Sequence, residues 1–197
     1  MNWRWIAPLG LLAIGLGAYI FLVEHRTLSR TVLDERKGAL LPAFVVDKVS
    51  RIEIARHGQR IAFVRKFSPS GAPNVARWNM IYPRHSALDK QAIDTLISEL
   101  EWVEPLRRLN AIGPRDLDRF GLALPRLRVR FWVLGKPHRL VVGIKEPRGQ
   151  GYYALGDDRA VAFVVGKEFV ETLARPSSAY VQRAEVPASD AGVTVPP

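Results

Sequence analysis

The longest apolar stretch of the chain lies at its amino-terminal end. Residues Ile6 to Val23 (IAPLGLLAIGLGAYIFLV) carry no charge. At a helical rise of about 1.5 Å per residue they extend roughly 27 Å, close to the thickness of a bilayer core. Trp3 and Trp5 precede the stretch, and Tyr19 lies near its far end, where aromatic rings favour the headgroup region. The pattern predicts a single transmembrane helix.

Two other interpretations of this stretch are less consistent with its residues. A cleaved signal peptide would place small residues at a processing site, and Gly15 with Gly17 offer such a pair, but the apolar run continues well beyond them. A buried soluble helix would need apolar partners on every side, which so short a chain does not supply. We therefore expect residues 1–23 to form an uncleaved anchor.

The distribution of basic residues does not decide the orientation of this anchor. Arg4 precedes it, whereas Arg26, Arg30, Arg36 and Lys37 follow it, and this count favours a long part on the cytoplasmic side. An anchor at the start of the chain followed by a large domain is, however, the usual layout of an exported protein. Both orientations stay open on charge alone.

Residues 24–48 begin with a polar stretch, and we interpret them as a stalk or linker. After them, apolar residues alternate with the period of two that is typical of β-strands. Residues 51–56 alternate with period two, His57-Gly58 can form a two-residue turn, and Gln59 to Lys66 returns as a second strand. A loop rich in proline and glycine, Phe67 to Val75, separates this predicted hairpin from a third short strand at Arg77 to Tyr82.

A helical period follows the third strand. Asp89 can cap a helix in which Ile93, Leu96, Ile97 and Leu100 form one apolar stripe and which ends near Val103. A shorter helix is predicted from Pro114 to Phe120, because proline suits the first helical position and Gly121 suits the exit.

The second half of the chain repeats the period of strands and then that of a helix. The predicted elements are a strand at Arg128 to Leu134, a turn at Gly135-Lys136, a strand at Pro137 to Ile144, a hairpin of Tyr152 to Leu155 with Ala160 to Val165, and a helix at Lys167 to Ala174. The last residues, 184–197, have no periodicity and are expected to be disordered.

The two halves share one order of hairpin, loop, aromatic strand and helix. We interpret residues 49–183 as an α+β domain of antiparallel hairpins, pseudo-duplicated as half-repeats at about 49–104 and 126–175. Whether the halves form one sheet or two is left open by the pattern.

Composition excludes several classes of site. The 197 residues contain no cysteine, which removes disulfides, thiolate metal sites, thiol nucleophiles and a lipidated cysteine anchor. A hydrophobic content of 48% is too high for a disordered chain, so a packed core is expected. The formal net charge is +10, and almost all of it belongs to residues after the anchor.

The remaining chemistry-bearing residues do not form a recognisable catalytic or ligand motif. Neither G-x-S-x-G nor S-x-x-K occurs, and no two of the four histidines, His25, His57, His85 and His138, have the spacing of a helical metal pair. Asp157-Asp158 suits a turn, and the glycines of residues 143–151 suit a hairpin loop, because the lysine and hydroxyl of a phosphate-binding loop are missing. We expect no catalytic, cofactor or metal site and no enzymatic activity.

The excess of positive charge calls for an anionic partner. Arg126, Arg128, Arg130 and Arg139, interleaved with Phe131 and Trp132, superficially resemble a surface that stacks nucleic-acid bases. The aromatic pattern of such surfaces is absent, and alternating arginines are also typical of a solvated strand face, so no nucleic acid is expected. Anionic lipid headgroups or anionic envelope polymers suit a tethered basic domain better.

Several segments between Leu33 and Gln182 resemble the bacterial family of domains of unknown function named DUF4340. They include LLPAFVVDKVSRIEIAR, AIDTLISEL and RAVAFVVGKEFVETL. The most specific is Asp116 to Pro125, with the pattern D-L-x-x-F-G-L-x-x-P.

The resemblance implies a location and a kind of role rather than a reaction. Members are similar to envelope proteins often encoded beside gliding-motility-type ABC transporter components, and no catalytic residues carry over. It therefore implies a domain on the outer side of the bacterial cytoplasmic membrane, with protein partners in the envelope and an accessory or scaffold role. The alternative is a tethered basic module that binds anionic polymer or lipid headgroups.

Overall fold

The structure is a computed structural model that describes residue 36 and residues 38–66 and 77–182. The predicted anchor Ile6 to Val23, the loop Phe67 to Val75 and the tail 184–197 lie outside these residues. Within the described part of the chain, no helix has the length and apolar character needed to cross a membrane.

The described residues form strands and three α-helices. The strands are β1 (Val49–Arg56), β2 (Gln59–Lys66), β3 (Arg77–Tyr82), β4 (Ser86–Ala87), β5 (Arg107–Asn110), β6 (Leu127–Val133), β7 (Lys136–Lys145), β8 (Gly151–Leu155) and β9 (Val161–Gly166). The helices are α3 (Lys90–Glu101), α4 (Pro114–Arg119) and α5 (Lys167–Leu173), with short 3-10 helices η2 (Val46–Lys48) and η3 (Ser177–Tyr180).

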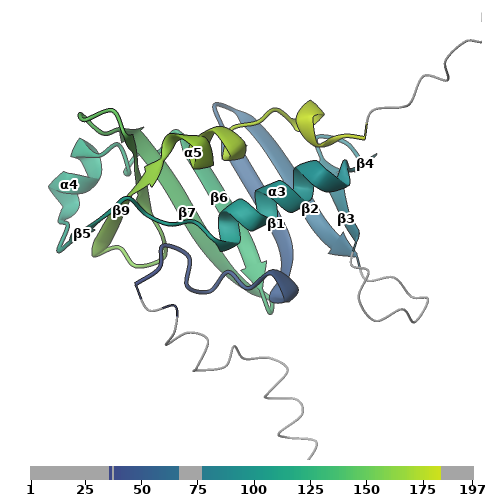
Figure 1. Ribbon diagram of the computed structural model, residues 1–197, viewed down its shortest axis with the longest axis horizontal. Coiled ribbons are helices and arrows are strands. Elements are labelled where there is room, and N and C mark those ends of the chain that lie inside the picture. Colours follow the sequence, from purple (N-terminus) through teal and green to yellow (C-terminus); the bar gives the residue numbers. More distant parts are fainter. Residues whose placement is uncertain (1–35, 37, 67–76, 183–197) are drawn as a thin grey trace, which may run out of the picture.

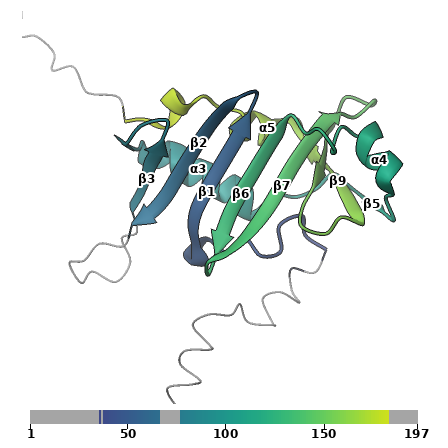
Figure 2. The same cartoon turned by 180° about the vertical axis from the view of Figure 1, so that it is seen from behind.

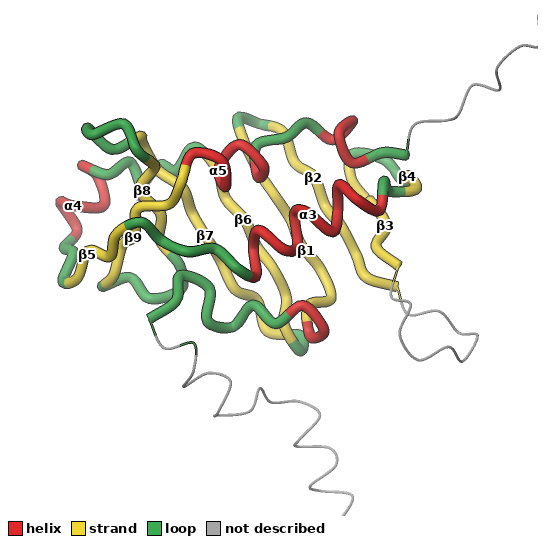
Figure 3. The backbone as a smooth tube through the Cα atoms, in the orientation of Figure 1, coloured by secondary structure: helices red, strands yellow, loops and turns green. Residues whose placement is uncertain are grey.

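All of these strands join one antiparallel sheet in the order β4-β3-β2-β1-β6-β7-β8-β9-β5. Helices α3 and α5 lie across one face of this sheet (Figures 1 and 3). Seen from behind, strands β2, β1, β6 and β7 have no helix over them (Figure 2). The α+β class with antiparallel strands is confirmed.

The first-half and second-half hairpins meet in the middle of the sheet. Strand β1 pairs with β6, and Ile52 lies opposite Phe131. The halves therefore share one sheet, and each consists of a hairpin, two further strands and a helix, in the orders β1-β2-β3-β4-α3 and β6-β7-β8-β9-α5. Duplication of an ancestral unit stays an interpretation of this order.

Helix α3 forms where its apolar stripe indicates. Its cap residue Asp89 accepts a hydrogen bond from the backbone N–H of Ala92 at 2.9 Å, and the predicted stripe of Ile93, Leu96, Ile97 and Leu100 is buried. The helix ends at Glu101, slightly earlier than expected. The stripe packs on the alternate residues of the sheet, so one face of β1, β2, β6 and β7 is the core.

The two hairpin turns follow the same backbone rule. His57 and Gly58 have φ values of 43° and 76°, as a type I′ turn requires at both central residues. In the second hairpin the central residues are Leu134 and Gly135, with φ of 50° and 79°, instead of the predicted Gly135-Lys136. The prediction was one residue late, because Lys136 already pairs with Val133 in the ladder.

The domain begins earlier than residue 49, where the predicted linker ended. Leu40, Leu41 and Phe44 are buried in the main core cluster. The ring of Phe44 meets the ring of Phe131 edge-on, with centroids 5.0 Å apart. The assignment of the whole of residues 24–48 to a linker was wrong, because this short apolar segment has too few residues to show a period.

Tyr180 is buried in the main core beside α5, and its ionisation should make the free energy of unfolding depend on pH. Its hydroxyl donates a hydrogen bond to the carbonyl of Thr172 at 2.9 Å, and burial raises the pKa of Tyr180 to about 12, against a smaller lowering by the charge of Arg175. The unfolded chain therefore loses this proton first as the pH rises. The free energy of unfolding is expected to be independent of this group below about pH 10 and to fall between about pH 10 and 12.

Urea denaturation at a series of pH values measures this effect, with Tyr180→Phe as the comparison. The phenylalanine variant should lose about 1 kcal/mol at neutral pH with the hydrogen bond, and should lack the Tyr180 part of the alkaline decline. Parallel declines in both proteins would contradict the assignment.

Candidate functional site

The sheet face opposite α3 and α5 carries a group of arginine side chains. Successive side chains of a strand point to opposite faces, so the residues that alternate with the core residues face away from the helices. We call this surface the basic face; it comprises Arg51 and Glu53 of β1, Arg60 of β2, Arg128, Arg130 and Trp132 of β6, and Arg139 of β7.

Glu53 holds two of these arginines in place. The residue is only 9% exposed, and each of its carboxylate oxygens pairs with a different guanidinium: Oε1 with Arg51, and Oε2 with Nη2 of Arg60 at 2.9 Å. The guanidinium of Arg51 also lies over the ring of Trp132, and that of Arg60 over the ring of Tyr82, at 5.1 and 5.7 Å from the centroids. Ion pairs and ring contacts together fix the two cations.

The other arginines of the basic face form no such ion pairs with described residues, although Arg130 lies directly opposite Glu53 of β1. Arg130 and Arg139 lie directly opposite each other on β6 and β7, and like charges in this position destabilise a sheet. Among the described residues, neither guanidinium nor that of Arg128 has an ion pair; Asp157 reaches only the backbone N–H of Arg139, at 3.0 Å. Five guanidinium groups against one carboxylate give this face a positive charge that suits an anionic partner.

The basic residues that the sequence pattern singled out lie in two different places in the structure. Arg128, Arg130 and Arg139 share the basic face, as expected for a solvated strand face. Phe131 lies on the opposite, buried face, so it is not available there for stacking. Arg126 precedes β6 and belongs to a different place, a pocket beside α5.

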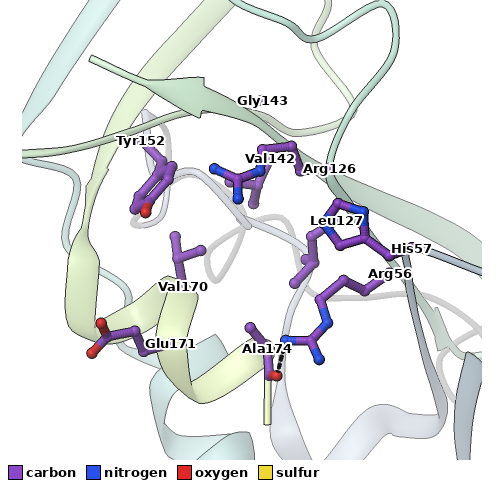
Figure 4. Close-up of a pocket in the computed structure, with 10 residues that line it drawn as sticks. All are labelled: Arg56, His57, Arg126, Leu127, Val142, Gly143, Tyr152, Val170, Glu171 and Ala174. Atoms are coloured by element: carbon purple, nitrogen blue, oxygen red, sulfur yellow. Dashed lines mark hydrogen bonds between the residues drawn. The ribbon is translucent and has the colours of Figure 1, made fainter. Parts of the chain in front are cut away.

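This pocket lies between the carboxyl-terminal half of α5 and the ends of β1, β6, β7 and β8, and has a volume of about 150 Å³ (Figure 4). Leu127, Val142 and Val170 give it apolar walls. Arg126 reaches across it toward Tyr152, with the guanidinium carbon 5.8 Å from the ring centroid.

The carboxyl end of α5 limits what this pocket can do chemically. Arg56 donates a hydrogen bond to the carbonyl of Ala174 and so satisfies the end of the helix. The partial negative charge of this helix end opposes the attraction of Arg126 for an anion. The pocket can admit a small, largely apolar group and does not by itself define a reaction.

His138 and the acidic pair Asp157-Asp158 take part in local structure. His138 Nδ1 lies 2.6 Å from Asp157 Oδ2, and the imidazole stacks on Phe131 at 5.3 Å between centroids. Asp158 accepts a hydrogen bond from the backbone N–H of Ala160, which is the predicted turn role. Among the described residues, no three His, Asp or Glu side chains gather as metal ligands would.

Gly143 has a packing role, whereas Gly149 lies in the turn between β7 and β8 with a φ of 76°. A Cβ atom on Gly143 would lie 2.1 Å from the carbonyl oxygen of Phe120. Strand β7 can therefore approach the end of α4 only with glycine at this position. Gly121, the predicted exit of α4, has a φ of 67°.

These features define an α+β domain with one continuous antiparallel sheet, helices over most of one face and a positively charged second face. Residues 78–194 match the model of the family described as "Domain of unknown function (DUF4340)", and the chain belongs to that family. The resemblance noted from its sequence motifs is thereby confirmed. No curated protein and no solved structure matches the chain.

Proposed function

We propose that this chain is a single-pass protein of the bacterial cytoplasmic membrane whose α+β domain lies on the outer side and binds protein partners. In this proposal it is an accessory or scaffold component of a membrane complex, of the ABC-type transport kind that the family resemblance implies, and has no enzymatic role. The apolar stretch Ile6 to Val23 supports the anchor, and the envelope location is the one that the family resemblance implies.

The basic face is the observation that carries the interaction role. The facing arginines Arg130 and Arg139 repel each other across β6 and β7. Glu53, opposite Arg130 on β1, offsets only part of this charge because it already pairs with Arg51 and Arg60. Carboxylates of a partner would relieve this repulsion on binding, and Arg51 and Arg60 are already held in place by Glu53. We therefore assign the partner an acidic protein surface.

Cross-linking in native membranes tests the proposal. The full chain, carrying an affinity tag, is cross-linked, solubilised in detergent and purified, and the copurified membrane proteins are identified. The proposal expects a defined partner. Its cross-linked yield should fall when salt is raised before the cross-linker is added, because exposed charge pairs are screened. Recovery of no membrane partner under cross-linking would refute it.

Orientation has a separate test, because the chain has no native cysteine. A single cysteine at the exposed position Leu124 should react with an impermeant maleimide as soon as the outer face of the cytoplasmic membrane is accessible. Reaction only after the cytoplasmic side is opened would place the domain inside.

The second candidate is a tethered module that binds anionic polymer or lipid headgroups. The net charge of +10 favours it. Its signature is binding to anionic vesicles or polymer that needs no protein partner and weakens with salt.

A further inference from the structure

An apolar surface segment lies where the chain enters the domain. Residues 102–106 join α3 to β5, and Trp102 and Leu106 in this segment are 68% and 58% exposed. The guanidinium of Arg36, the first described residue, lies over the ring of Trp102 at 5.7 Å from the centroid. A shallow cavity of about 200 Å³ separates the entering chain from the end of α3.

Contacts of Arg36 fix this entry point to the body of the domain. Its Nη1 donates to the carbonyl of Phe44 at 2.6 Å, and its Nη2 lies 3.6 Å from Glu101 Oε1. The start of the described chain is therefore held against the end of α3, on the side of the sheet that α3 and α5 cover.

The length of chain before Arg36 brings this side of the domain close to the bilayer. Thirteen residues lead from Val23, the end of the apolar stretch, to Arg36. They span about 20 Å as a helix and at most about 45 Å when extended. An anchored domain is thus confined to the membrane surface, with the side around Arg36 attached to the tether.

We propose that the segment 102–106 docks on the lipid surface, with Trp102 and Leu106 at the level of the headgroups. This inference rests on the membrane anchor of the proposed function. Tryptophan favours that region because its ring is apolar and its N–H can stay hydrated, and Arg36 beside it can keep its charge in water.

The charges around the segment indicate that docking does not need anionic lipid. Glu101 pairs with Arg36, and Glu104 adds a negative charge to the segment. Arg108, on the adjoining strand, brings a positive charge that offsets it. Burial of apolar surface is therefore the driving term, and neutral phosphatidylcholine vesicles should suffice.

Docking on this side would also fix where the basic face points. The basic face is on the opposite side of the sheet from α3, so it would face away from the bilayer. This arrangement leaves it open to an acidic domain that a membrane partner carries outside the bilayer, rather than to headgroups of the same membrane.

Site-specific fluorescence tests this inference on the full chain, whose lack of cysteine allows single labels. Leu106→Cys is labelled with an environment-sensitive dye in phosphatidylcholine vesicles, and quenching by nitroxide lipids is measured. Leu124→Cys is the matched control, because Leu124 is 85% exposed and follows α4, which packs on the other face. Quenching at position 106 should exceed that at 124 by roughly twofold or more and should persist in high salt.

The outcomes separate the anchor from the docking. A chain that fails to float with the vesicles would refute the anchor in the proposed function. A chain that floats, but is quenched equally at positions 106 and 124, would refute the docking alone. A label at position 106 that is shielded from water without quenching by lipid would mean that another protein, such as a second copy, covers the segment, and would also overturn it.

Discussion

Replacing Phe131 with alanine is expected to lower the free energy of unfolding by about 3–5 kcal/mol, because it removes a fully buried ring and leaves a cavity. Phe131 lies opposite Ile52 at the junction of the two hairpins. Its ring also meets those of Phe44 and His138. The loss would therefore loosen the amino-terminal segment and both halves of the sheet at once.

Urea denaturation followed by far-ultraviolet circular dichroism measures this loss. Phe131→Leu is the control, since it keeps most of the volume and should cost much less than alanine at the same position. Exposed Arg148, in the loop between β7 and β8, offers a second control, because Arg148→Ala should change stability by less than about 0.5 kcal/mol. A small effect of Phe131→Ala would mean that the junction is not the centre of the core.

The second large effect is expected on partner binding. Arg139→Glu places a carboxylate opposite Arg130 and replaces a repulsive cross-strand pair by an attractive one. The free energy of unfolding should therefore rise by roughly 0.2–1 kcal/mol. Binding of the cross-linked acidic partner should fall by roughly tenfold or more, because the substitution reverses one charge and neutralises its neighbour.

The test is specific because Arg139→Glu should raise the free energy of unfolding and at the same time weaken partner binding. Arg148→Glu alters the charge of the chain by the same amount in a loop away from the basic face, and should leave partner binding close to that of the unmodified protein. Equal losses for Arg139→Glu and Arg148→Glu would indicate a general effect of net charge. A loss of stability in Arg139→Glu would contradict the repulsion assigned to this pair.

The elements that sequence pattern predicted well are those with strong local signals. The hairpin of β1 and β2 follows from period-two alternation and from Gly58 in a two-residue turn. Helix α3 follows from its stripe and the Asp89 cap, and α4 from a proline at its start and a glycine at its exit. Each of these signals acts within a few residues.

Other features depend on long-range pairing and could not be predicted in this way. Strand β5 has only four residues, with the mainly polar sequence RRLN, and it is held at the sheet edge by β9. The burial of Leu40 and Phe44 depends on packing against residues far along the chain.

The candidate site also depends in part on pairing between strands that are far apart in the sequence. The alternation of Arg128 and Arg130 on one strand face could be predicted from the sequence. The repulsion between Arg130 and Arg139 required the register of β6 with β7, and the role of Glu53 between Arg51 and Arg60 required that of β1 with β2. The pocket beside α5 gathers residues from several elements and left no local signal.

The junction of β1 with β6 has a further consequence for biosynthesis. As the chain leaves the ribosome, β1, β2 and β3 are synthesised long before β6. Until β6 emerges, the backbone edge of β1 that pairs with β6 stays unpaired, and the strand also carries the apolar side chains of Ile52 and Ile54. Unpaired apolar edges are templates for aggregation. Contacts between residues so far apart in sequence also form slowly. The first half of this domain is therefore the part of the nascent chain that most needs protection until residue 133 has been synthesised.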